Sequence, residues 1–233
     1  MVTNSKFSPE LTSARLQKIF QHLLNVIGPR HWWPGDGALE IIIGAILTQN
    51  TAWKNVEKAI SELKKRNLLS ISALDAVELA ELASVIRSSG YYNQKAKKIK
   101  HFIRYLIENY GGSLQEMEKV SVETLRQELL QISGIGAETA DSILLYALNK
   151  PTFVIDAYTH RIFQRHQWTK GRVNYEELRQ FFLQHLPQDL YVYNEFHALI
   201  DYVGHHFCRR EPNCEICPLK NELPQQNQMK EES

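Results

Sequence analysis

The sequence has few cysteines, no long apolar run and almost no net charge. Only three of its 233 residues are cysteine, and all three lie between positions 208 and 217, which excludes a disulfide framework spread over the chain. The longest apolar run, residues 38–47, is interrupted by Glu40 and is too short to cross a bilayer. Because the formal net charge is only +1, a surface for a polyanion must come from local clusters of basic residues.

Strand-like alternation of polar and apolar residues is also missing. Run 38–47 fits a buried helix or a buried strand by its periodicity, and the lack of a strand pattern elsewhere favours the helix. The sequence opens without a charged leader followed by a hydrophobic segment, so we expect a cytoplasmic protein, associated with the nucleoid if its source is prokaryotic. Only the tail after Leu223 has the composition of a disordered segment.

The most informative stretch is residues 130–156. Gly134 and Gly136 predict a tight turn between a helix that ends near Ile132 and one that begins near Ala137, because glycine adopts positive φ angles and lets a partner approach the backbone. The first N–H groups of the second helix then point out of the turn and form an anion site, for which a DNA phosphate is the natural ligand. An ordinary helix–helix connection is the alternative reading of the two glycines.

An acidic residue follows this second helix. Pro151 ends the helix, and Asp156 comes 20 residues after Gly136, which leaves room for one helix and a short return. The separation suits a carboxylate placed beside a phosphate site. Capping the next helix is the other role open to Asp156.

Aromatic residues flank run 38–47 on both sides. Trp32, Trp33 and Pro34 precede it, and Trp53 follows it. They are either core anchors or an aromatic wall, on which a base taken out of a duplex would stack.

A polar corner lies between run 38–47 and the helix that begins near Trp53. Thr51 can cap that helix while Gln49 points outward, with Asn50 beside it.

The densest basic cluster lies on the helix that opens after Gly90. Its members are Lys95, Lys97, Lys98, Lys100 and Arg104. Such a run is often only a solvated face. Because we place this helix in the same lobe as the hairpin, we expect one or two of these residues, including Lys95, to contact phosphate.

Together these pieces resemble the helix–hairpin–helix (HhH-GPD) DNA glycosylases of the endonuclease III branch, over roughly residues 16–218. Segments 31–34, 47–53, 89–96 and 134–143 are similar to the 3-methyladenine DNA glycosylase III subfamily in particular. The resemblance implies an all-α fold with a cleft between two lobes. One is a six-helix barrel lobe, residues 30–150, that carries the hairpin, and the other is built from residues 1–29 and 151–233.

The resemblance also implies roles for single residues. Asp156 matches the catalytic aspartate, whose carboxylate stabilises the positive charge that develops on the sugar and can orient or deprotonate a water. Trp32, Trp33, Pro34 and Trp53 suit a pocket for a cationic alkylated base through stacking and cation–π attraction. The residues expected to contact DNA are Gln49, Asn50, Gly134, Gly136, Ala137, Thr139 and Lys95, and Gln49 would fill the space that the base leaves.

Two positions depart from the family pattern. Bifunctional members carry a Schiff-base lysine where this chain has Glu138, so we expect a monofunctional enzyme. The family's iron–sulfur loop has four cysteines, whereas this chain has Cys208, Cys214 and Cys217, with Leu223 at the fourth place. Three readings stay open: a [4Fe–4S] cluster with an exogenous fourth ligand, zinc with His205 or His206, or no metal.

The sequence therefore predicts a monomeric DNA glycosylase that extrudes a damaged base from double-stranded DNA and hydrolyses its bond to deoxyribose. An alkylated purine such as 3-methyladenine is the expected base. An endonuclease III-type glycosylase and lyase acting on oxidised pyrimidines is the enzymatic alternative, and Glu138 argues against it. A DNA-binding protein without catalysis is the second alternative, against which Asp156 argues.

Overall fold

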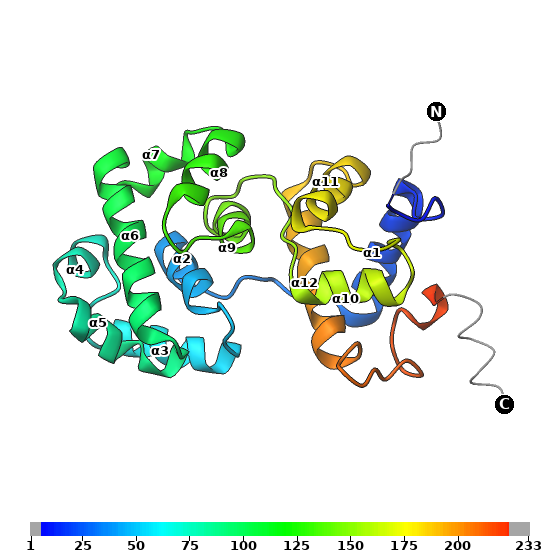
Figure 1. Cartoon of the computed structure of the whole chain (residues 1–233), viewed down its shortest axis with the longest axis horizontal. Helices are drawn as coiled ribbons and strands as arrows, with labels where there is room; N and C mark the ends of the chain where they lie inside the picture. Colours follow the sequence, from blue (N-terminus) through cyan, green and yellow to red (C-terminus); the bar gives the residue numbers. More distant parts are fainter. Residues whose placement is uncertain (1–5, 224–233) are drawn as a thin grey trace. The chain divides into compact units, whose positions relative to one another are not determined.

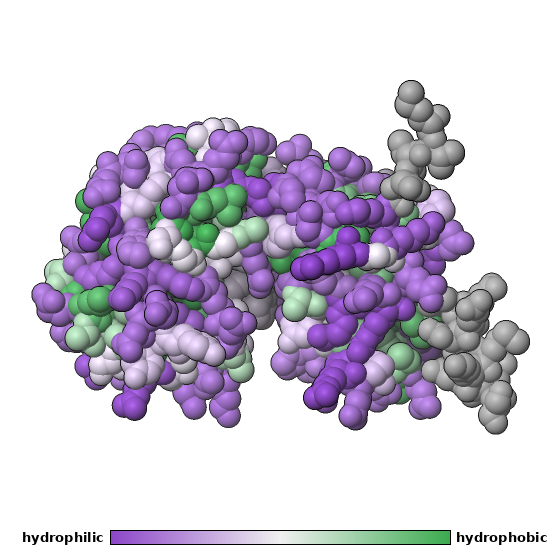
Figure 2. Space-filling model, viewed as in Figure 1, coloured by the Kyte–Doolittle hydropathy of each residue, from purple (hydrophilic) through white to green (hydrophobic). Residues whose placement is uncertain are grey.

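The computed structural model describes residues 6–223, and the tail predicted to be disordered lies outside this range. Within these residues the regular elements are helices, and an isolated β-bridge pairs Phe7 with Thr169 (Figure 1). The predicted all-α fold is confirmed. None of the described helices is long and apolar enough to span a membrane. Hydrophilic residues dominate the face in Figure 2, interrupted by small apolar patches.

The chain divides into two compact units. We call residues 33–150 the central unit. Residues 6–32 and 151–223, from the two ends of the described chain, form the terminal unit. Each unit is described by itself below.

The central unit is built around a helix that is apolar on all sides. This is α2 (Ala38–Leu47), which is buried from Ile42 to Leu47 and packs against α3, α6, α9 and η2. The run 38–47 is therefore a buried helix, as predicted. The other elements of the unit are α3 (Trp53–Lys65), α4 (Ile71–Ala76), α5 (Leu79–Val85), η1 (Arg87–Ser89), α6 (Tyr92–Tyr110), α7 (Leu114–Glu118), α8 (Val122–Gln131), α9 (Ala137–Ser142) and the π-helical η2 (Ile143–Ala147).

The terminal unit packs its helices around aromatic rings. Its elements are α1 (Ser13–Ile27), α10 (Ala157–Arg165), α11 (Tyr175–His185), α12 (Leu190–His206) and η3 (Lys220–Glu222). Phe153 stacks on Phe182, with 3.9 Å between ring centroids, and both rings contact Phe196 edge-on. On α12, Gly204 lies so close to Tyr158 of α10 that a Cβ atom there would overlap with the tyrosine. Glycine thus permits the close packing of α10 on α12.

Polar side chains cap several of these helices. Ser121 caps α8, and Asn174 forms a capping box with Glu177 on α11. Thr51 does not cap α3, contrary to the prediction: Ala52 is the N-cap residue, and the Thr51 hydroxyl donates to the Ser89 carbonyl oxygen at 2.5 Å. A contact with a segment distant in sequence therefore takes the hydroxyl that could have capped α3.

Candidate functional site

The hairpin consists of α8 and α9, and a buried ion pair joins the two helices. Arg126 donates from Nε and Nη2 to the two carboxylate oxygens of Asp141, at 2.9 and 3.0 Å. Asp141 is completely buried. This bidentate pair fixes the angle at which the turn between the helices is presented.

The two glycines of the turn are needed for different reasons. Gly134 has a φ of +92°, and a Cβ atom there would overlap with the side chain of Lys98. Gly136 is the N-cap of α9, with an ordinary φ of −94°, and a Cβ atom there would meet nothing within 4 Å. Neither the backbone nor the packing of the chain requires glycine at 136. The open space in front of it suits the approach of an external partner.

Gln49 is folded onto the hairpin rather than pointing outward as predicted. Its amide nitrogen donates to the Gly134 carbonyl at 3.2 Å and to the Thr139 hydroxyl at 2.9 Å. Its amide oxygen accepts a hydrogen bond from the Lys98 ammonium. The α2–α3 corner and the hairpin are therefore one polar cluster. Asn50, the next residue after Gln49, is exposed and has a positive φ of 51°.

The prediction that Lys95 contacts phosphate is wrong. Its side chain is 1% exposed, and its ammonium donates to Leu47 O, Thr51 Oγ1 and Ser89 O at 2.6 to 2.8 Å. All three ammonium hydrogens are used inside the protein. Burial, with a smaller contribution from the charge of Lys98, lowers the pKa of Lys95 to about 8. The Lys95 ammonium therefore links three chain segments through hydrogen bonds and is not available to bind a DNA phosphate.

The basic face is accordingly narrower than the sequence suggested. Lys97 and Arg104 are exposed, whereas Lys100 donates to the Asp75 carbonyl at 2.7 Å. Lys98 is the lysine that lies against the hairpin glycine. It is therefore the cation best placed for a phosphate bound at the turn.

An exposed aromatic residue at this surface was missed from the sequence. Tyr91 precedes α6, has a left-handed φ of +45° and is 74% exposed. Its segment is tied to the α2–α3 corner by the hydrogen bond between Thr51 and Ser89. A positive φ is uncommon for an aromatic residue. The sequence signal that could have identified Tyr91 is its position between Gly90 and the first residue of α6.

Part of the predicted base pocket forms in the central unit. Trp33 packs edge-on against Trp53, with centroids 5.2 Å apart, and in a tilted arrangement against Tyr146, with centroids 5.4 Å apart. Gly44 leaves room for the indole, because a Cβ atom there would lie 3.2 Å from Trp33 Nε1. Tyr146 was missed because the π-helical turn of η2, not regular helical spacing, sets its direction.

The other two residues predicted to line the base pocket are placed differently from the rings of Trp33, Trp53 and Tyr146. Trp32 belongs to the terminal unit and is half-buried, and Pro34 is exposed. Upstream of Trp32 the backbone is fixed by Glu195 of α12, which is 2% exposed. Its carboxylate accepts hydrogen bonds from the backbone N–H groups of Arg30 and His31, at 2.6 and 2.8 Å.

Asp156 is the N-cap of α10 and is 9% exposed. Its Oδ1 accepts hydrogen bonds from the backbone N–H of Thr159 at 2.6 Å and from the Thr159 hydroxyl at 2.7 Å. Oδ2 lies 3.7 Å from Nε2 of His197 on α12. One oxygen thus anchors the carboxylate at the positive end of a helix, and the other faces a titratable side chain. Capping and catalysis are compatible at this residue.

The three cysteines surround a small cavity of about 20 Å³ in the terminal unit. Arg165, His166 and Leu223 are among the other residues that line it. Leu223 therefore lies where a fourth thiolate would be needed, and burial raises the pKa of the Cys217 thiol. His205 and His206 do not line the cavity. Across residues 6–223, no group of three or more potential ligands has the arrangement of a metal site. The residues present do not fit a four-thiolate cluster.

Arginines hold this loop in place. Arg161 donates to the carbonyl oxygens of Cys208 and Gly204 at 2.6 and 2.8 Å. Arg165 donates to the carbonyl oxygens of Arg209 and Arg210 at 2.5 and 3.0 Å, and to the Cys208 sulfur at 3.3 Å. Both arginines lie on α10, the helix that Asp156 caps, so their hydrogen bonds connect the loop to this helix.

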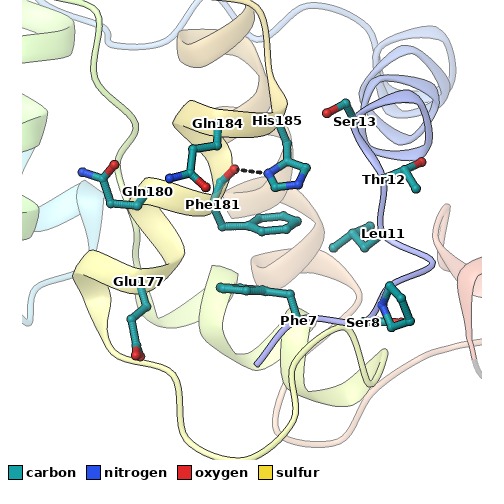
Figure 3. A pocket seen from close by; sticks show the side chains of 11 residues that line it. Phe7, Ser8, Leu11, Thr12, Ser13, Glu177, Gln180, Phe181, Gln184 and His185 are labelled. Carbon is teal, nitrogen blue, oxygen red and sulfur yellow. Dashed lines mark hydrogen bonds between the residues drawn. The ribbon is translucent and has the colours of Figure 1, made fainter. Parts of the chain in front are cut away.

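A larger hollow in the terminal unit contains none of the predicted site residues. It has a volume of about 520 Å³ and lies between residues 7–13 and α11 (Figure 3). The rings of Phe7, Phe181 and His185 stack in sequence, each 4.2 Å from the next. The ring nitrogen of His185 is engaged with the Phe181 carbonyl at 2.8 Å.

Comparison with known proteins gives a consistent result. Residues 43–188 match the HhH-GPD superfamily of base excision DNA repair proteins. The chain is 46% identical, over 88% of its length and 94% of the relative, to MJ1434 of Methanocaldococcus jannaschii, an inferred DNA repair glycosylase. It is 33% identical to endonuclease III of Thermotoga maritima, over 78% of this chain and 80% of that one.

A solved structure extends this comparison. The chain resembles the H. pylori 3-methyladenine DNA glycosylase in its complex with 1,N6-ethenoadenine. The TM-score is 0.72 at 28% identity, and the match covers 84% of this chain and 98% of that chain.

Proposed function

Because the chain belongs to the HhH-GPD superfamily of base excision DNA repair proteins, we propose that it is a monofunctional DNA glycosylase acting on alkylated purines. The observation that carries this proposal is the Asp156 carboxylate, fixed by Thr159 at the start of α10. A carboxylate held in one orientation can stabilise charge in a transition state without first reorganising.

The chemistry asked of Asp156 is hydrolysis of an N-glycosidic bond. As the bond breaks, its electron pair goes to the base and positive charge develops on the sugar. The carboxylate stabilises this charge and accepts the proton that the attacking water loses as its oxygen bonds to the sugar carbon. An alkylated purine that is already cationic leaves as a neutral base. Such a reaction needs no strong acid to protonate the leaving group.

The hairpin supports double-stranded DNA as the partner. Gly136 leaves the start of α9 open, and Lys98 supplies a cation beside Gly134. Exposed Tyr91 can stack on a base step that opens when a nucleotide leaves the duplex. Gln49 would have to release Lys98 and Thr139 before it could enter the duplex. We propose that the protein acts in this way as a monomer.

The aromatic cluster supports an alkylated base. Trp33, Trp53 and Tyr146 offer faces and edges to a flat cation, to which the electron-rich ring face is attracted. The similarity to a 3-methyladenine DNA glycosylase supports the same substrate class. The exposed Glu138, at the place of the Schiff-base lysine, supports a reaction that stops after base release.

A second candidate is a glycosylase and lyase of the endonuclease III type, favoured by the 33% identity to the Thermotoga protein. One assay separates the two. Duplex DNA carrying tritiated methyl groups and a duplex with a single thymine glycol are incubated with the enzyme, and strand breaks are counted before and after hot alkali. We expect release of methylated purines and breaks only after alkali.

The assay includes controls and a result that rejects the proposal. Asp156→Asn should lose base release while keeping the α10 cap, because asparagine caps as well as aspartate. Breaks without alkali on the oxidised pyrimidine would replace our proposal with the lyase. Full activity of Asp156→Asn would remove the proposed mechanism.

A further inference from the structure

One face of α12 packs against the start of α10. His197, Asp201 and Gly204 are spaced at i, i+4 and i+7, so they lie on the same side of the helix. Gly204 contacts Tyr158 at the distance that only glycine allows, and His197 lies 3.7 Å from Asp156. Asp201 stands between these two contacts. It therefore faces the turn of α10 that Asp156 caps.

The two carboxyl groups have different environments. Asp156 receives two hydrogen bonds from Thr159 and is the N-cap residue of α10. Asp201 lies in the middle of α12, and no group within residues 6–223 donates a hydrogen bond to its side chain. Environments that differ in this way assign a proton to one member of a carboxyl pair.

The charged groups around Asp201 also indicate that Asp201 is the carboxyl group of the pair that holds the proton. Burial, and then the negative charge of Asp156, raise the pKa of Asp201 to about 6. His197 on the same helix and Arg30 from the segment after α1 act in the opposite direction, with smaller effects. The same two carboxyl groups affect Tyr158 on α10. Burial makes the largest contribution to the raised pKa of Tyr158, and the negative charges of Asp201 and Asp156 raise it further.

We propose that Asp201 is a positioning residue for the reaction at Asp156: it is the carboxyl group of the pair that gains and loses a proton, and its ionised form accelerates base release. This inference rests on the proposed role of Asp156. When Asp201 is protonated, the pair carries one negative charge. When it is ionised, the pair carries two, and the positively charged transition state is stabilised further. The proton exchanges between Asp201 and solvent.

The test is a pH profile of single-turnover release from tritium-methylated duplex DNA, between pH 5 and pH 8. The wild-type rate should rise about tenfold with a midpoint near pH 6, where Asp201 loses its proton, and a tenfold change corresponds to about 1.4 kcal/mol of transition-state stabilisation. Asp201→Asn should give a flat profile at the low-pH wild-type rate. Asp201→Glu should keep the rise, and the exposed Asp75→Asn should match the wild type.

The outcomes separate this inference from the proposed function. An unchanged profile in Asp201→Asn, with Asp156→Asn inactive, overturns only the role of Asp201. Activity in Asp156→Asn overturns the proposed function. Carboxyl ¹³C NMR of aspartate-labelled protein tests the proton assignment without turnover. A resonance that titrates near pH 6 and disappears in Asp201→Asn is expected, and its absence would refute the assignment even if no methylated base is released.

Discussion

Arg126 and Asp141 form a two-bonded ion pair, at 2.9 and 3.0 Å, between the two helices of the hairpin. The carboxylate is fully buried, and the arginine side chain is 15% exposed. A pair this deep holds the hairpin geometry only while both members are present, because either charge alone would be buried without its partner.

Arg126→Ala should therefore destabilise the protein by about 3 to 5 kcal/mol, the effect typical of a buried charge that has lost its partner. Urea unfolding measures the change. Arg104→Ala on the exposed face of α6 is the matched control and should change stability by less than about 0.5 kcal/mol. Recovery in the double variant Arg126→Met, Asp141→Leu would attribute the loss to the buried charge. A loss below about 1 kcal/mol in Arg126→Ala would contradict this account.

Gly136→Ala should separate DNA binding from folding. The new Cβ atom meets nothing in the protein and φ is ordinary, so the melting temperature should stay equal or rise slightly. Affinity for a duplex with an abasic-site analogue, measured by fluorescence anisotropy, should fall about tenfold, the effect of roughly 1.4 kcal/mol. Gly134→Ala is the contrasting variant and should lower the melting temperature. Unchanged affinity in Gly136→Ala would place the phosphate elsewhere.

Lys95 should make stability depend on pH in alkaline solution. The folded protein releases the lysine proton near pH 8, whereas the unfolded chain keeps it to near the ordinary value of 10.5. Between these values the unfolded state binds more protons, so the free energy of unfolding should rise with pH, by at most about 1.4 kcal/mol per pH unit. The difference between wild type and Lys95→Met, followed by urea unfolding from pH 7 to 10, isolates this contribution. A constant difference would argue against a lowered pKa.

Thr159→Val should reduce catalysis more than stability. It removes the hydroxyl donor to Asp156 Oδ1 but keeps the backbone donor. Base release should fall about tenfold or more, because a hydrogen bond to a charged group contributes roughly 1.5 kcal/mol or more. Thr159→Ser retains the hydroxyl and should stay close to the wild-type rate. Equal rates in all three proteins would show that this hydroxyl does not position Asp156.

The cysteine loop should depend on arginine rather than on metal. Arg161→Ala removes one hydrogen bond to the loop carbonyl of Cys208 and one to the Gly204 carbonyl near the end of α12, and should lower the free energy of unfolding by about 1 to 3 kcal/mol. Incubating the wild type with a strong chelator should leave its melting temperature unchanged. A large fall on chelation, together with iron or zinc in the purified protein, would contradict this expectation.

The sequence by itself determined the helices and the order of the motifs. Apolar spacing and capping residues such as Ser121 and Asn174 are local signals, since they depend on contacts within one turn of helix. The same holds for the glycine turn at Gly134 and for Asp156 after the helix that ends before Pro151. These features are encoded within short stretches, and the family resemblance rests on them.

Tertiary structure decided which polar side chains are available to a partner. Lys95 is four residues before buried Ile99, so helical spacing already indicated an inner position, but the acceptors that satisfy its charge come from residues 47, 51 and 89. Gln49 is bound by Thr139 and Lys98, which are distant in sequence. Asp201 gained its neighbour Asp156 only through the packing of α12 on α10. Burial and charge at these positions arise from segments that the chain brings together only on folding, and no local pattern records them.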